Sequence, residues 1–114
     1  MKPYFIFSFL VILVVLSGCS QGSSKYDTFA KCLTEKRVTM YGTEWCSHCQ
    51  NQKKAFGDSF QFINFVDCDR NKDICLEKGI RGYPTWIIDG KAYPGEQRLE
   101  RLASLSGCEL IEDE

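Results

Sequence analysis

Cys46 and Cys49 are the residues whose type and spacing most directly suggest chemistry, because they stand two residues apart in Trp45-Cys46-Ser47-His48-Cys49. A thiolate is the attacking species in thiol–disulfide exchange, and a second thiol one helical turn away can attack the mixed disulfide that forms. At the start of a helix over residues 46–56, free N–H groups and the helix dipole favour a thiolate at Cys46. A protonated or donor imidazole of His48 beside the Cys46 sulfur would stabilise this thiolate and make the disulfide a stronger oxidant.

Two other kinds of site use the same cysteine spacing. Cys68 and Cys75 could complete a zinc site with Cys46 and Cys49, but zinc knuckles usually repeat the tight spacing in both halves, and these two lie further apart. A haem attachment motif would need a histidine directly after the second cysteine, where this chain has Gln50. The spacing therefore favours a redox pair and leaves a zinc-binding module as an alternative.

The N-terminal segment predicts export. An apolar run of about 13 residues over 4–16 follows Lys2, which is the length of a signal peptide and short for a membrane-spanning helix. It ends in Leu16-Ser17-Gly18-Cys19, which resembles the bacterial lipobox, in which the cysteine is lipidated. We therefore predict a signal peptide over 1–18 and a lipidated Cys19 with a tether over 19–26, which would hold the protein at an extracytoplasmic membrane surface. An ordinary signal peptide or a short anchor is the alternative.

Length and composition agree with one small exported domain. The chain has 114 residues, 44% of them hydrophobic and 25% charged, which is typical of a globular protein. The net charge of -1 and the lack of a basic patch argue against a nucleic-acid partner, and we expect a monomer. Seven cysteines suit an oxidising compartment, or a metal or redox role in a reducing one. The acidic tail, residues 109–114, is expected to be solvated.

Apolar periodicity and turn residues predict an α-β-α-β-α-β-β-α order over residues 27–108. The predicted helices are 27–36, 46–56, 72–78 and 97–105, and the predicted strands are 38–41, 60–66, 85–88 and 91–93. A helix between the first two strands implies a parallel pair with a right-handed crossover. Asp89-Gly90 predicts a tight hairpin between the last two. The expected fold class is α/β, with a central four-stranded mixed sheet flanked by helices.

The segment Gly79-Ile80-Arg81-Gly82-Tyr83-Pro84-Thr85 resembles the part of the thioredoxin superfamily that carries a cis-proline opposite the CxxC pair. The resemblance covers residues 29–105 and implies a minimal thioredoxin fold with a cis Tyr83-Pro84 bond. It also implies that Pro84 packs against the active cysteines and leaves nearby backbone free to bind an extended client segment. Trp45 and Tyr83 would contact that client, Trp45 by covering the redox pair, whereas Trp86 would be structural. The implied activity is protein thiol–disulfide exchange without cofactor or metal.

A narrower resemblance concerns residues 40–50, 82–86 and 90–95, which look like the thioredoxin domain attached to bacterial and plant vitamin K epoxide reductase homologues. This resemblance implies a domain that passes oxidising equivalents between client thiols and a quinone-linked membrane enzyme. That family carries a second cysteine pair, and Cys68 and Cys75 fall in the matching region. A disulfide between them could be a structural staple or a relay.

Three departures from thioredoxin itself point away from a general cytosolic reductase. Met40 stands where thioredoxin has a buried acid, Ser47-His48 replaces its Gly-Pro, and its extra N-terminal strand is absent. Cys32 and Cys108, on the first and last predicted helices, could be buried thiols or a terminal staple. We therefore expect an extracytoplasmic oxidase or shuttle, with a tethered reductase and a redox-inert zinc module as alternatives.

Overall fold

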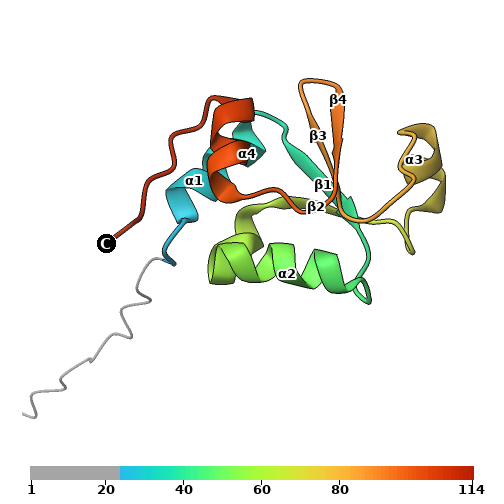
Figure 1. The fold of residues 1–114 in the computed structure, drawn as a ribbon, viewed down its shortest axis with the longest axis horizontal. Helices are drawn as coiled ribbons and strands as arrows, with labels where there is room; N and C mark the ends of the chain where they lie inside the picture. Colours follow the sequence, from blue (N-terminus) through green and yellow to red (C-terminus); the bar gives the residue numbers. More distant parts are fainter. Residues whose placement is uncertain (1–23) are drawn as a thin grey trace, which may run out of the picture.

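A four-stranded mixed sheet forms the centre of the described part of the chain, residues 24–114 of a computed structural model (Figure 1). The strands β1 (Thr39–Gly42), β2 (Asn64–Asp67), β3 (Thr85–Ile88) and β4 (Lys91–Pro94) lie in the order β2-β1-β3-β4. β1 and β2 are parallel, and the other two neighbouring pairs are antiparallel. The predicted parallel pair, C-terminal hairpin and α/β class are therefore confirmed.

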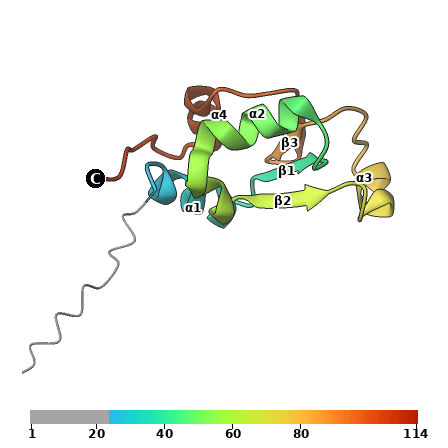
Figure 2. The same ribbon diagram turned by 90° about the horizontal axis from the view of Figure 1, so that it is seen from below.

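The helices are α1 (Asp27–Glu35), α2 (Ser47–Phe56), α3 (Lys72–Glu77) and α4 (Leu99–Ser106), with a 3-10 helix η1 (Gly57–Phe62) after α2. α2 runs along the sheet, while α3 lies at the end of the sheet opposite to α1 and α4 (Figures 1 and 2). The element order matches the prediction apart from η1. α2 and β3 both begin at the end of the sheet where α3 lies (Figure 1). Cys46 and Tyr83, which precede these two elements, are therefore in contact.

The predicted strand over 60–66 is wrong in its first half. Residues 57–62 form η1, and β2 begins only at Asn64. Ser59 is fully buried, and its hydroxyl accepts a hydrogen bond from the Tyr26 N–H and donates one to Asp27 at the start of α1. The Phe60 ring packs on Phe56, 6.1 Å away between ring centroids. These contacts outweigh the strand preference of the aromatic residues, because β-propensity depends strongly on context. β2 is also an edge strand and is only partly buried, whereas its aromatic and β-branched residues are typical of a buried strand.

The turn between β3 and β4 forms as the sequence predicts. Asp89 and Gly90 have φ values of 50° and 74°. Two successive positive φ angles are the requirement of a type I′ turn, which suits the twist of a two-residue hairpin and favours glycine. The hairpin pairs Ile88 with Lys91 and thereby fixes the register of the sheet edge.

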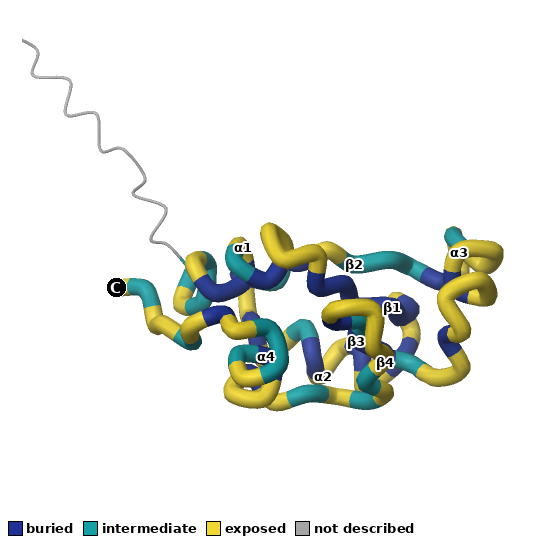
Figure 3. The backbone as a smooth tube through the Cα atoms, turned by 90° about the horizontal axis from the view of Figure 1, so that it is seen from above, coloured by how far each residue is buried: buried dark blue, intermediate teal, exposed yellow. Residues whose placement is uncertain are grey.

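The main core lies between the sheet, α1, α2 and α4, and the dark blue of Figure 3 is continuous along β1. Phe29 of α1 stacks on Phe56 of α2, and Phe56 packs on Trp86 of β3. Trp86 is fully buried, as expected for a structural residue, and its Nε1 donates to Oε1 of Gln52 at 3.0 Å. The same oxygen accepts the N–H of Gln97 at 2.7 Å, so one buried amide ties α2 to β3 and to the segment before α4.

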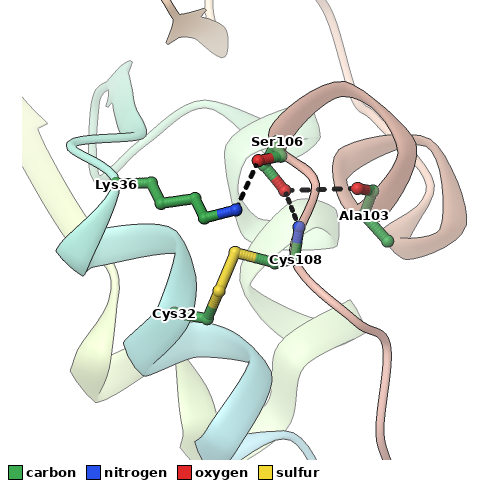
Figure 4. Close-up of a disulfide and its surroundings, with 5 residues drawn as sticks. All are labelled: Cys32, Lys36, Ala103, Ser106 and Cys108. Atoms are coloured by element: carbon green, nitrogen blue, oxygen red, sulfur yellow. Dashed lines mark hydrogen bonds between the residues drawn. A yellow bond between two sulfur atoms is a disulfide. The ribbon is translucent and has the colours of Figure 1, made fainter.

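A disulfide joins Cys32 of α1 to Cys108 just after α4 (Figure 4). It settles the two alternatives for these residues in favour of a staple. The nearby Lys36 Nζ donates to the carbonyl of Ser106 at 3.0 Å. The bridge spans 76 residues of sequence, so the entropy that it removes from the unfolded chain corresponds to about 4 kcal/mol.

The acidic tail is not simply solvated, as was expected. The carboxylate of Asp113 accepts the backbone N–H of Thr28 at 2.9 Å and its hydroxyl at 2.6 Å, in the first turn of α1. The backbone N–H of Asp113 donates to the carbonyl of Lys25 at 2.8 Å. A negative charge at a helix N-terminus is favoured by free N–H groups and the helix dipole. The predicted signal peptide, Cys19 and most of the tether lie outside the described residues.

Candidate active site

Cys46 is the N-cap of α2, and its sulfur lies where an incoming sulfur could reach it. Its Sγ accepts the backbone N–H of Cys49 at 3.3 Å, so the helix start solvates the sulfur as the sequence predicts. The thiol also lies 3.5 Å from the carbonyl oxygen of Tyr83, to which it donates. Cys46 retains 8% exposure, whereas Cys49 is fully buried. Cys46 is therefore the member of the pair that a client can attack or that can attack a client.

Cys49 lies one turn further along α2 and is held as a thiol. Burial raises the pKa of Cys49 to about 12, and the hydrogen bond with Cys46 adds to the rise. Both cysteines are free. A nucleophile that retains some exposure beside a fully buried second thiol is the arrangement that two-step exchange needs, because the second thiol acts only on a mixed disulfide already formed at the first.

Gly42, the last residue of β1, makes room for the Cys49 sulfur. A Cβ atom on Gly42 would lie 2.7 Å from Sγ of Cys49 and 3.3 Å from Cε2 of Phe65. Real Cβ atoms do not approach a sulfur this closely, so the strand backbone itself forms one wall of the redox pair. This role of Gly42 was not predicted, although a glycine four residues before Cys46 marks the end of the predicted strand 38–41.

Tyr83 and Pro84 form the wall opposite α2. The Tyr83-Pro84 peptide bond is cis, as the resemblance implies. Pro84 is fully buried, and its carbonyl accepts the N–H of Gly95 at 2.7 Å, which anchors the segment to the end of β4. The structure thus brings together Cys46, Cys49 and Tyr83-Pro84, which the sequence analysis selected as parts of one site.

Trp45 lies beside the redox pair and is 68% exposed. Its ring packs edge-on against Tyr83, 6.2 Å between centroids, and its Nε1 donates to the carboxylate of Asp69 at 2.7 Å. The side chain is therefore fixed in orientation while most of its surface is open to solvent. This placement fits the expected client contact, and Asp69 is a support that the sequence did not reveal.

His48 lies on the exposed side of the helix start. Its Nδ1 is 2.7 Å from Oε2 of Glu96, in the segment between β4 and α4. The imidazole thus bridges the CxxC turn to the segment after the β3–β4 hairpin. The expected influence of His48 on Cys46 stays a prediction, and Glu96 is its partner that sequence spacing could not identify because it is 48 residues away.

Cys68 and Cys75 form a disulfide between the end of β2 and α3. The backbone N–H of Cys68 donates to the carbonyl of Gly42 at 2.8 Å. Gly42 also contacts the Cys49 sulfur, so this one residue lies between the second disulfide and the redox pair. Cys68 and Cys75 line a cavity of about 220 Å³ together with Leu76, Ile80 and Tyr83. Because both sulfurs are in a disulfide, they are not available as thiolate ligands for a zinc site.

Comparison with known proteins agrees with this geometry. The sequence profile of the thioredoxin family matches residues 21–105. Thiol-disulfide oxidoreductase LTO1 of Arabidopsis thaliana is 40% identical over 101 residues, covering 80% of this chain and 27% of the relative. Protein disulfide isomerase-like 2-2 of Oryza sativa subsp. japonica is 34% identical over 99 residues, covering 73% and 27%.

Among solved structures, a thioredoxin of Fasciola hepatica gives a TM-score of 0.45 at 20% identity, covering 69% of this chain and 89% of that chain. The chain spans about a quarter of the length of the two curated relatives, 27% of each. The family profile covers well over half of the chain, and the two free cysteines lie within it. The chain therefore belongs to the thioredoxin family, and its site is of the thiol–disulfide oxidoreductase type.

Proposed function

We propose that this chain is an extracytoplasmic thiol–disulfide oxidase or shuttle, which accepts electrons from client protein thiols at Cys46–Cys49 and passes them to a quinone-linked membrane enzyme. The observation that carries the exchange reaction is the placement of Cys46 Sγ. It sits at the N-terminus of α2, 3.5 Å from the Tyr83 carbonyl and next to a buried second thiol. The resemblance of residues 40–50, 82–86 and 90–95 to the thioredoxin domain attached to vitamin K epoxide reductase homologues supports the choice of the membrane partner.

The reaction starts from the oxidised pair. A client thiolate attacks Sγ of Cys46, the Cys46–Cys49 bond breaks, and Cys49 leaves as a thiolate that takes up a proton. A second client thiolate then attacks the client sulfur of the mixed disulfide, and Cys46 leaves as a thiolate. Two electrons have moved from the client dithiol to the pair, and the client holds a new disulfide. The quinone-linked enzyme would remove those electrons by the same kind of exchange.

The proposed location rests on the leader and on cysteine usage. Two disulfides, Cys32–Cys108 and Cys68–Cys75, suit an oxidising compartment. Within residues 24–114 no helix is long and apolar enough to cross a membrane. A lipid on Cys19 would hold the domain near a membrane partner. Mass spectrometry of Cys19 in the membrane fraction tests this part of the proposal, with Cys19→Ser as the control.

The redox potential of Cys46–Cys49 tests the direction of electron flow. We expect a potential well above about −270 mV, the value of thioredoxin, because a strong oxidant has a stabilised reduced form. A difference of 30 mV corresponds to about 1.4 kcal/mol for this two-electron couple. A potential at or below that of thioredoxin would instead favour the tethered reductase. Absence of any exchange with a model dithiol, together with stoichiometric zinc on Cys46 and Cys49, would establish the zinc-binding module.

A further inference from the structure

Cys49 has to carry a negative charge during exchange, although its surroundings oppose one. In either direction the step at Cys49 passes through its thiolate, as nucleophile or as leaving group. Burial is the strongest cause of its raised pKa. Met40, two residues before Gly42 in β1, is fully buried and carries no charge that could help. Some other group must therefore favour charge transfer to and from this sulfur.

Lys53 is the cation nearest in sequence to Cys49 on the same helix. It follows Cys49 by four residues in α2, and residues four apart are neighbours on one helix face. Its Nζ lies 4.3 Å from the centroid of the Phe65 ring and 5.5 Å from that of Phe60. It also pairs with Oε2 of Glu44 at 2.9 Å. These contacts direct the long side chain inward across the aromatic rings, and only 23% of it is exposed.

Phe65 connects the ammonium group with the redox pair. The edge of the ring, Cε2, lies 3.3 Å from the Cβ position of Gly42, and that position lies 2.7 Å from Sγ of Cys49. The ammonium group of Lys53 and the Cys49 sulfur therefore lie on either side of the Phe65 and Gly42 contact. Charge interactions through such partly buried surroundings are screened less than those between exposed groups. The side chain of Glu44, the ion-pair partner of Lys53, is 67% exposed, whereas that of Lys53 is 23% exposed.

We propose that Lys53 stabilises the thiolate of Cys49 electrostatically and so sets the rate of the step at Cys49 in both directions of exchange. This inference rests on the exchange reaction proposed above and concerns its second sulfur. During reduction of a client, the Cys49 thiol gives its proton to water, and its sulfur attacks Cys46. A Cys46–Cys49 bond forms, the bond between Cys46 and the client breaks, and the client leaves as a thiolate. The reverse reaction has Cys49 as the leaving thiolate.

The groups that act on Cys49 agree with this role. The titratable and charged groups are Cys46, which raises the pKa of Cys49 after the larger effect of burial, and Lys53, which lowers it. The hydrogen bond with the backbone of Thr43 also lowers the pKa of Cys49, and by more than the charge of Lys53 does. Glu44 forms an ion pair with Lys53 at 2.9 Å. Among these groups, Lys53 provides a full positive charge. Lys54, its neighbour on the exposed face of α2, has no such position and supplies a matched control.

The test uses reduced protein and an aromatic disulfide, dithionitrobenzoate, in a Cys19→Ser background. Reduction is limited so that Cys32–Cys108 and Cys68–Cys75 stay intact, and a count of two thiols verifies this. Attack by Cys46 releases one thionitrobenzoate in a second-order phase. Attack by Cys49 on the resulting mixed disulfide releases another in a first-order phase. The two sulfurs are thus observed separately by stopped-flow absorbance, at several pH values between 6 and 9 as a rough range.

Lys53→Met should slow the first-order phase about threefold at each pH and leave the second-order phase unchanged. The factor is small because the loss of thiolate fraction is partly offset by the greater nucleophilicity of a more basic thiolate. Lys53→Arg should restore the rate, and Lys54→Met should have no effect. An unchanged first-order phase in Lys53→Met, or a Lys53→Arg variant as slow as Lys53→Met, would overturn the inference. Loss of the second-order phase in the parent protein would instead contradict the proposed function.

Discussion

Gly42 and Cys49 touch so closely that residue 42 cannot carry a side chain without moving the sulfur. A Cβ atom on Gly42 would lie 2.7 Å from Sγ of Cys49. The carbonyl of the same glycine accepts the N–H of Cys68 at 2.8 Å, which extends the β1–β2 ladder by one hydrogen bond. Gly42 therefore contacts both the Cys49 sulfur and, through its carbonyl, the backbone of the Cys68–Cys75 disulfide.

Gly42→Ala should slow the step at Cys49 more than it affects the step at Cys46. The added methyl group must displace either the Cys49 sulfur or the backbone of β1, which is paired on both sides and cannot move easily. Overpacking of this kind costs about 1–3 kcal/mol of stability. The two phases of thionitrobenzoate release and a urea unfolding curve measure both effects.

Gly82→Ala is the matched control for this variant. Gly82 directly precedes Tyr83, whose carbonyl lies 3.5 Å from Sγ of Cys46, but nothing lies within 4 Å of the Gly82 Cβ position. It should keep the rate of the first-order phase and change stability little. Equal slowing by both substitutions would show that the contact between Gly42 and Cys49 is not the cause.

Much of the site followed from local sequence, and the remainder depends on contacts between distant segments. The Cys46–Cys49 helix start could be predicted because an uninterrupted helical stretch follows the first cysteine. The cis Tyr83-Pro84 bond followed from a resemblance over a short motif. The partner of His48 could not be found in this way, because Glu96 reaches it only after the sheet and its hairpin have formed.

The fold shows the same division between local and distant determinants. The Asp89-Gly90 hairpin was predictable because two positive φ angles are demanded within the turn itself. The error at residues 60–66 arose because aromatic residues suggest a strand. The buried Ser59 instead hydrogen-bonds the start of α1 and holds η1 in place. The docking of Asp113 was likewise missed, because a charge-rich terminus gives no local sign of the N–H groups that it binds 85 residues away.

The two disulfides should differ in their contribution to stability. Replacing Cys68 and Cys75 by serine should lower the free energy of unfolding by about 2 kcal/mol, and replacing Cys32 and Cys108 by about 4 kcal/mol, because the second loop is longer. Urea unfolding of the folded variants measures this difference. Equal losses would mean that loop entropy does not control the effect.

The same serine variant of Cys68 and Cys75 separates a staple from a relay. Their sulfurs are nearly buried, at 2% and 4% exposure, so we expect the redox potential of Cys46–Cys49 and the rate of client oxidation to be preserved at temperatures where the variant is folded. A large fall in turnover with a membrane oxidase, without loss of folded protein, would instead show a relay.

Glu96→Gln should raise the redox potential of Cys46–Cys49. The Glu96 carboxylate pairs with His48 at 2.7 Å and offsets any positive charge on the imidazole. Without that carboxylate, a cationic His48 would stabilise the Cys46 thiolate, and hence the reduced form, more strongly. Exposed ion pairs contribute up to about 1 kcal/mol, which corresponds to a shift of up to about 20 mV. Equilibration with glutathione measures the potential.

Two companion variants define the cause of that shift. Glu100→Gln removes an exposed carboxylate in the first turn of α4 and should leave the potential unchanged. In a His48→Ala background, Glu96→Gln should have no further effect, because the partner is gone. A shift of the same size in that background would mean that Glu96 acts on the cysteines without His48.

Asp113→Asn should destabilise the protein at neutral pH and have no effect in acid. The hydroxyl of Thr28 is the main cause that holds the pKa of Asp113 below its ordinary value of 3.8, and the backbone N–H of Thr28 adds to it. A carboxyl group whose pKa is lower in the folded state stabilises that state above its unfolded pKa, and this contribution is lost as pH falls through the folded pKa.

The difference in free energy of unfolding between the parent protein and Asp113→Asn should therefore be constant above about pH 5 and shrink as pH falls below 3.8. Urea unfolding at a series of pH values measures this difference directly. Glu109→Gln, in the same tail, removes an equal charge and should show no such pH-dependent gap. A gap that persists below the folded pKa would mean that the amide substitution disturbs packing, because the protonated and amide side chains have lost the same charge. A gap of the same size in Glu109→Gln would assign the effect to the net charge of the tail rather than to the hydrogen bonds between Asp113 and Thr28.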